Sequence, residues 1–106
     1  MSKKPDNVRT GILAEAEEAV NSRDETYGPP EDCFLRIARL WNAHLKNIGM
    51  VTEDGDPILS TGDVALMMIQ VKVARLSFQI ANQDSWTDIA GYAACGAEVS
   101  EDLESE

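Results

Sequence analysis

Residues 63–81 read DVALMMIQVKVARLSFQIA, and this stretch decides the fold. Apolar side chains occur at nearly every position of the helical wheel, so they surround the helix instead of forming a single stripe. Such a helix is central in a bundle or is covered by another chain. The stretch therefore predicts an all-α domain built around a third helix at about 63–81. Three short neighbouring helices are too few to cover it, so we also expect a dimer or a larger oligomer.

Three further helices are predicted on either side of this stretch. The first spans about 8–21, is capped by Asp6 or Asn7, and is followed by a loop over 21–29. The second begins at Pro30 and stops at Gly49, and the fourth spans about 85–98. An irregular loop or small hairpin over 50–59 joins the second helix to the third, whose start carries the capping-box pair Ser60 and Asp63. We expect one domain, bundle-like and with four helices, over 8–99, between an N-terminal arm at 1–7 and an acidic tail at 100–106.

The composition of the chain excludes several classes of function. The chain has 106 residues and a net charge of -10, which opposes binding to duplex nucleic acid. No apolar run approaches the length of about 18 residues that a membrane-spanning helix needs, so no membrane role is expected. Two cysteines, Cys33 and Cys95, are too few for a disulfide framework or a zinc site. These features favour a protein of a reducing cytoplasm.

A basic stripe interrupts the apolar third helix. Lys72, Arg75 and Gln79 are spaced i, i+3 and i+7 and so share one face. A cation buried without an opposite charge costs several kcal/mol, so the stripe must meet an anion. Its partner is either an acidic side chain of another helix or a phosphate group of a ligand.

The first helix offers acidic side chains. Glu15 and Glu18 are three residues apart and share one face of the helix. Two carboxylates placed in this way can jointly coordinate a hard cation such as Mg²⁺. The same pattern also suits a solvated face, or ion pairs with Lys72 and Arg75.

The start of the fourth helix offers two more carboxylates. Asp84 and Asp88 are four residues apart, so both can point at one site. Alternatively they stabilise the start of the helix, where acidic side chains are favoured and where Ser85 and Asp88 resemble a capping box. Gly91 lies among small residues that permit close helix packing, which predicts a structural role for it.

The predicted loop after the first helix combines a cation with an aromatic ring. Arg23 can contact a phosphate, and Tyr27 either stacks on a base or packs on the core. Trp86 and Tyr92, on the fourth helix, complete the candidate nucleotide-binding set with Lys72 and Arg75.

Several runs of this sequence resemble a family of small bacteriophage and prophage proteins of unknown function. The most specific run is DSWTDIAGYA at 84–93, and the others are RDETYG at 23–28 and segments within 34–41, 63–66 and 72–76. The resemblance covers about 12–98. It implies a protein encoded by a phage and acting in the host cytoplasm.

A more distant resemblance is to the all-α nucleoside triphosphate pyrophosphohydrolases of MazG type. These are dimeric or tetrameric helical bundles that hold Mg²⁺ with a Glu-x-x-Glu helix and a Glu-x-x-Asp helix. Glu15 and Glu18 match the first motif, but the third helix carries Lys72 and Arg75 where acids are expected. Asp84 and Asp88 of the next helix would have to substitute for these acids. With that substitution, the resemblance implies Glu15, Glu18 and Asp88 as catalytic residues. It implies these three and Asp84 as magnesium ligands.

Three functions are compatible with these features. The first is a Mg²⁺-dependent nucleotide pyrophosphohydrolase, in which Lys72 and Arg75 neutralise developing charge. The second is a non-catalytic phage protein that sequesters a signalling nucleotide of host defence, which needs cations and aromatic rings but no metal. The third is an acidic adaptor that binds and inhibits a host protein.

Overall fold

The computed structural model describes residues 7–104, which form four helices and no strand. They are α1 (Val8–Tyr27), α2 (Pro30–Asn47), α3 (Thr61–Phe78) and α4 (Gln83–Glu104). The predicted all-α class is confirmed. The segment between α2 and α3 is irregular and contains a turn in which Gly55 N–H donates to the Thr52 carbonyl at 3.1 Å, so the hairpin alternative was wrong. No helix within 7–104 is both long and apolar enough to span a bilayer.

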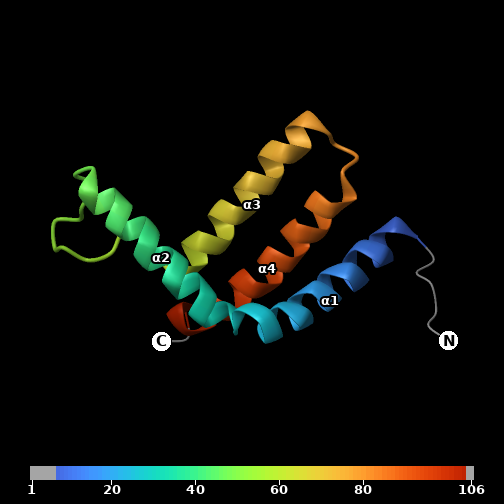
Figure 1. The fold of residues 1–106 in the computed structure, drawn as a ribbon, viewed down its shortest axis with the longest axis horizontal. Coiled ribbons are helices and arrows are strands. Elements are labelled where there is room, and N and C mark those ends of the chain that lie inside the picture. The colour runs from blue at the N-terminus through green and yellow to red at the C-terminus, as the bar shows by residue number, and fades with distance from the viewer. Residues whose placement is uncertain (1–6, 105–106) are drawn as a thin grey trace.

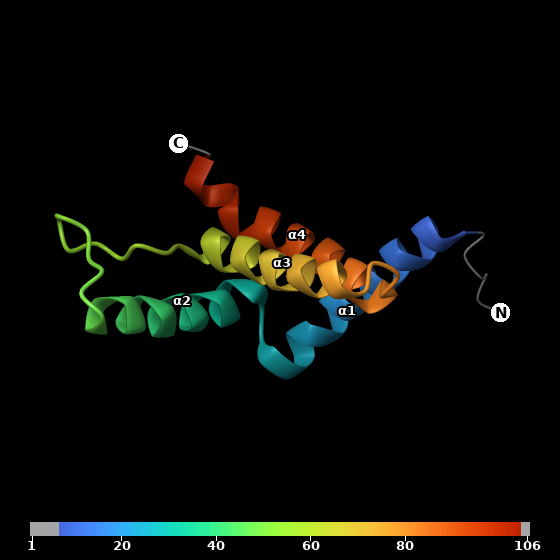
Figure 2. The same ribbon diagram turned by 90° about the horizontal axis from the view of Figure 1, so that it is seen from above.

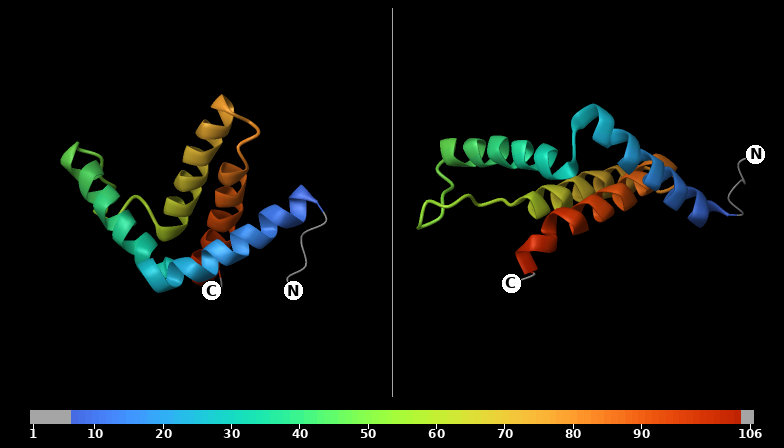
Figure 3. Two further views of the ribbon diagram at one scale, coloured as in Figure 1. Left: turned by 45° about the vertical axis from the view of Figure 1, so that its right-hand side comes forward. Right: turned by 90° about the horizontal axis from the view of Figure 1, so that it is seen from below.

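The helices form an open arrangement. In Figure 1, α3 and α4 lie side by side as an antiparallel pair, α1 crosses α4, and α2 diverges from α3 towards the 50–59 loop. Figure 2 shows that α2 lies beside only the start of α3 and extends away from it, and the left view of Figure 3 shows the same divergence. The radius of gyration is 16.1 Å, compared with about 13 Å for a compact domain of about 100 residues. The expected bundle is therefore more open and elongated than a four-helix bundle usually is.

Side chains at the helix starts explain where three helices begin. Asn7 Oδ1 accepts a hydrogen bond from Thr10 N–H at 2.9 Å, so Asn7 caps α1, while the alternative cap Asp6 lies outside the described residues. Ser60 and Asp63 form the predicted capping box of α3. For α4 the prediction was wrong, because Asn82 Oδ1 accepts from Ser85 N–H at 2.9 Å. Asn82 is the cap because α4 begins at Gln83, which places Ser85 in its first turn.

The first and fourth helices are longer than predicted. The segment 21–26 contains neither glycine nor proline, and it continues α1 as a polar helix instead of forming a loop. The break comes at Gly28, which adopts φ 81°, followed by Pro29. The fourth helix continues to Glu104, so the described part of the predicted acidic tail is helical.

The core lies where α2 meets α3. Phe34 and Ala38 of α2 pack with Val64 and Ala65 of α3 in one buried cluster, and Trp41 is half-buried against it. The opposite face of α3 is exposed. Leu66 there is 60% exposed, and Phe78 at the helix end is 94% exposed.

The helices α3 and α4 approach each other closely at Gly96. A Cβ atom added at this position would lie 2.8 Å from the Cβ of Ala65. At Gly91, for which sequence predicted the close packing, the nearest atom to an added Cβ is Val20 Cγ2 at 3.9 Å. Of Gly91 and Gly96, the position that requires glycine is therefore Gly96, because α4 packs closely against Ala65 of α3 at that point.

Candidate functional site

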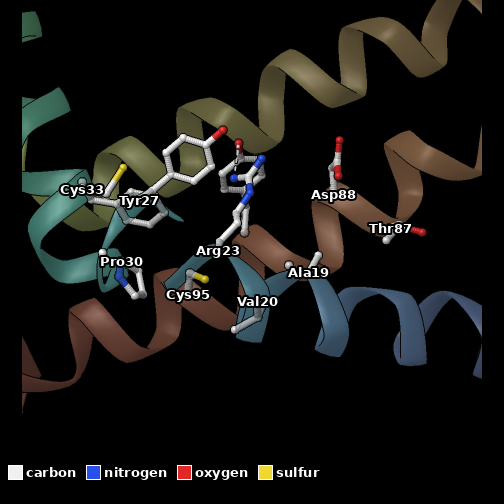
Figure 4. A pocket seen from close by; sticks show the side chains of 13 residues that line it. Ala19, Val20, Arg23, Tyr27, Pro30, Cys33, Thr87, Asp88 and Cys95 are labelled. Carbon is white, nitrogen blue, oxygen red and sulfur yellow. Dashed lines mark hydrogen bonds between the residues drawn. The ribbon is translucent and has the colours of Figure 1, made fainter. Parts of the chain in front are cut away.

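A pocket with a cavity volume of about 260 Å³ lies where α1, α2 and α4 meet. Figure 4 shows its lining from close by. The wall is largely apolar, and the residues that supply it include Ala19, Val20, Pro30, Cys33, Phe34 and Cys95. The consecutive helices α1 and α2 thus line one site together with α4, which is distant from them in the chain.

Arg23 is the cation of this pocket. It is exposed at the rim, and its Nη1 donates a hydrogen bond to the Tyr92 hydroxyl at 3.3 Å. The guanidinium carbon lies 5.6 Å from the ring centroid of Tyr92 and 5.9 Å from that of Tyr27, within the range of cation–π attraction. The hydrogen bond to Tyr92 raises the pKa of Arg23, and the nearby Asp88 carboxylate raises it further, although partial burial acts in the opposite direction. The side chain is therefore held as a cation between two aromatic rings.

The extension of α1 places this cation. Ala19, Val20, Arg23 and Tyr27 are spaced so that they share one face of a helix, and all four line the pocket. A loop over 21–29 would not impose this register.

Tyr92 links the rim to the core. Its ring is half-buried and packs against Phe34, with centroids 6.3 Å apart and planes inclined by 32°. Tyr27, in contrast, is exposed at the mouth of the pocket instead of packing in the core. The structure therefore brings together three of the predicted binding residues: Arg23, Tyr27 and Tyr92.

Asp88 provides the acidic side of the pocket and the anion for the basic stripe. Its Oδ2 lies 3.0 Å from Lys72 Nζ, and the two side chains are 37% and 12% exposed. The ion pair joins α4 to α3, which are adjacent antiparallel helices. Of the two partners left open for Lys72, an acidic side chain is the one observed, and it comes from Asp88 instead of Glu15 or Glu18. Arg75 is exposed.

The four predicted magnesium ligands do not converge. Glu15 Oε2 accepts a hydrogen bond from the buried Thr87 hydroxyl at 3.3 Å, whereas Glu18 lines a separate shallow groove along α1. Asp84 is exposed in the first turn of α4. Within the described part of the chain, no three Asp, Glu, His or Cys side chains are grouped closely enough to hold a metal ion. The residues as arranged do not fit a Mg²⁺ site, and magnesium binding stays a prediction.

Trp86 lies outside the pocket. Its Nε1 donates to the Ile80 carbonyl at 2.9 Å, which fastens the turn between α3 and α4. The ring lines a shallow apolar groove with Ile12 and Leu13 of α1. We therefore leave Trp86 out of the candidate site.

Sequence reasoning missed the walls of this pocket. Cys33 and Cys95 were considered only as disulfide or zinc residues, and Val20 and Phe34 were not among the predicted site residues, yet all four line the same cavity. A signal was present in the spacing of Val20, Arg23 and Tyr27, but it is visible only if 21–27 is read as helix.

Comparisons with known proteins agree with the resemblance to phage proteins. Residues 11–100 match the family described as "Domain of unknown function (DUF6378)". The chain is 40% identical over 83 residues to the "Gene 55 protein" of Mycobacterium phage L5, and the alignment covers 77% of this chain and 47% of that protein. It is 35% identical over 92 residues to the "Gene 55 protein" of Mycobacterium phage D29, and this alignment covers 86% of this chain and 54% of that protein. The chain spans about half the length of these curated relatives, and no solved structure matches it significantly.

Proposed function

Because this chain belongs to the DUF6378 family, whose description assigns no activity, its function has to be inferred from the site, and we propose that it binds a nucleotide in the pocket between α1, α2 and α4. One observation carries the proposal: a guanidinium is fixed between two tyrosine rings at the rim of an apolar, aromatic-walled cavity. A nucleotide has the complementary parts, a flat ring with an apolar face and an anionic phosphate.

The size of the cavity limits what it can enclose. Its volume of about 260 Å³ is close to the lower end, about 300 Å³, of the range for small-molecule sites. One base-sized ring fits inside against Phe34 and Tyr92, and the phosphate remains at the rim near Arg23. The ligand is therefore a mononucleotide, or one unit of a longer nucleotide.

Electrostatics at the rim favour an anion although the chain has a net charge of -10. The carboxylate near Arg23 in the lining is that of Asp88, which is paired with Lys72, and at physiological salt exposed charges beyond about 8 Å are largely screened. Arginine also contacts phosphate through two parallel hydrogen bonds, which strengthens and orients the contact.

Binding without hydrolysis is the form of the proposal that the side-chain contacts favour. Asp88 forms an ion pair with Lys72, and Glu15 accepts a hydrogen bond from Thr87. Both contacts would have to be replaced by contacts with the metal in a MazG-like magnesium site. A pocket that holds a nucleotide unchanged suits a phage protein that sequesters a signalling nucleotide of the host. The Mg²⁺-dependent pyrophosphohydrolase and the acidic adaptor are the alternatives that the following experiment separates.

Arg23→Ala is expected to weaken nucleotide binding by about 10- to 100-fold, since it removes a hydrogen bond between charged groups. Affinity is measured by titration calorimetry with a panel of nucleoside mono- and triphosphates, with Mg²⁺ and with chelator, and the recovered nucleotide is analysed for pyrophosphate release. Arg36→Ala is the matched control, because Arg36 is exposed on α2 and lies outside the pocket.

Each outcome supports one function. Unchanged nucleotide with affinity that depends on Arg23 supports binding. Pyrophosphate release that needs Mg²⁺ and is lost in Glu18→Gln supports the hydrolase. If no nucleotide binds the wild-type chain, the proposed function is wrong and the adaptor takes its place.

We also propose that a second copy of the chain covers the outer face of α3. Leu66, Gln70, Val73 and Ser77 form an exposed, uncharged line at helical spacing. Identical surfaces can meet along this line without bringing like charges together, in a chain that is otherwise strongly acidic.

Light scattering at about 10 μM is expected to give the mass of a dimer or larger species. Leu66→Glu should shift this mass to that of the monomer, because it places a charge opposite its own symmetry partner. Leu40→Glu makes the same substitution at an exposed leucine of α2 and should leave the mass unchanged. A monomeric wild-type chain would contradict the proposal.

A further inference from the structure

The polar groups of the pocket gather on one side. In Figure 4 the guanidinium of Arg23, the hydroxyl of Tyr27 and the carboxylate of Asp88 all point towards α3, whereas Val20 and Cys95 lie on the opposite wall. A ligand in this pocket therefore meets a donor and an acceptor along one edge and apolar surface elsewhere.

Asp88 keeps acceptor capacity after its ion pair is formed. Lys72 Nζ approaches Oδ2 at 3.0 Å, while a carboxylate offers two oxygens with about four lone-pair sites. The Lys72 side chain is largely buried, so it holds the carboxylate in place and offsets its repulsion of a phosphate nearby. The pocket thus contains a fixed, charged acceptor close to the cation that is assigned to the phosphate.

In a nucleotide, the sugar lies between the base and the phosphate. If the base fills the apolar interior and the phosphate meets Arg23, the sugar lies at the rim beside Asp88. A carboxylate is a strong acceptor for sugar hydroxyls, as in dinucleotide-binding sites, where an acidic side chain accepts from the ribose 2′-hydroxyl.

We propose, resting on the nucleotide binding proposed above, that Asp88 accepts a hydrogen bond from the ribose and makes this pocket selective for ribonucleotides over 2′-deoxyribonucleotides. The base itself is read weakly. The hydroxyl of Thr87, a polar group of the lining, is donated to Glu15, and an apolar wall discriminates poorly between rings of equal size. The site distinguishes the sugar more strongly than the base.

The test compares the dissociation constants of AMP, 2′-dAMP, GMP and 2′-dGMP for the full chain, in the presence of chelator. We expect each ribonucleotide to bind about tenfold or more tightly than its deoxy counterpart, as for a hydrogen bond to a charged group. AMP and GMP are expected to differ by less than this. Equal affinities for AMP and 2′-dAMP, or a larger difference between AMP and GMP than between AMP and 2′-dAMP, would overturn the inference while leaving nucleotide binding intact. If none of the four binds, both the inference and the proposed function are wrong.

Two variants assign the selectivity to Asp88. Lys72→Met with Asp88→Ala removes the carboxylate without leaving a buried lysine unpaired, and it should bring the ratio of ribo- to deoxyribonucleotide affinity close to one. Lys72→Met alone keeps the carboxylate and should keep the ratio above that of the double variant. Circular dichroism and urea unfolding establish that both are folded. A ratio that is unchanged in the folded double variant would exclude Asp88 as the selective residue.

Discussion

Phe34→Ala is expected to lower the free energy of unfolding by about 3–5 kcal/mol. Phe34 is 5% exposed and packs with Ala38, Val64 and Ala65 where α2 meets α3. Truncation removes the largest side chain of this cluster and leaves a cavity, because α3 cannot move into the space without separating from α4. Domains of this kind have about 5–15 kcal/mol of stability in total, so the substitution removes a large fraction of it.

The measurement is urea unfolding followed by circular dichroism at 222 nm. Leu35→Ala is the control, since Leu35 is the adjacent apolar residue and is 39% exposed. Its cost should be less than about 1 kcal/mol. Similar losses for the two variants would show that the core does not depend on the packing of α2 against α3.

Gly96→Ala and Gly91→Ala are expected to change stability in opposite directions. Alanine is the better helix former by up to about 1 kcal/mol, which is the gain expected at Gly91, where an added Cβ meets ordinary contact distances. At Gly96 the added methyl lies 2.8 Å from the Cβ of Ala65, and neither atom can rotate away. The helices α3 and α4 must separate, and overpacking of this kind costs about 1–3 kcal/mol.

Thermal unfolding distinguishes the Gly96→Ala and Gly91→Ala variants. A difference of about 3 kcal/mol between the variants corresponds to a difference of roughly 12 °C or more in Tm for a domain of this size. Because both substitutions are the same and lie on the same helix, propensity alone predicts equal effects. An equal gain in both variants would mean that α3 and α4 are further apart than the structure shows.

Local patterns were sufficient to predict most of the fold. The capping box at Ser60 and Asp63, the proline at the start of α2 and the apolar stretch of α3 each depend on contacts within a few residues, and each is found as predicted. The errors lie where local signals compete. Polar residues over 21–26 are compatible with a loop or with an exposed helix, and the outcome follows from packing of α1 against α4.

The candidate site was predictable only in part. Arg23, Tyr27 and Tyr92 were chosen for their chemistry, and the structure places them together. Their common location depends on two facts that no short pattern contains, the extra turns of α1 and the crossing of α1 over α4. The same crossing separates Glu18 from Asp88, which sequence had combined in one metal site.

The sequence by itself determined the helical class, the capping box at the start of α3 and the need of Lys72 for an anionic partner, because propensity, capping and the cost of burying a charge all act within a helix or on one side chain. Only the tertiary structure decided that this partner is Asp88, that Gly96 and not Gly91 permits the approach of α3 to α4, and that two cysteines and three aromatic rings enclose one pocket. These outcomes depend on the angle and register at which helices cross. That geometry is set by the summed packing of many side chains, and no single spacing in the chain specifies it.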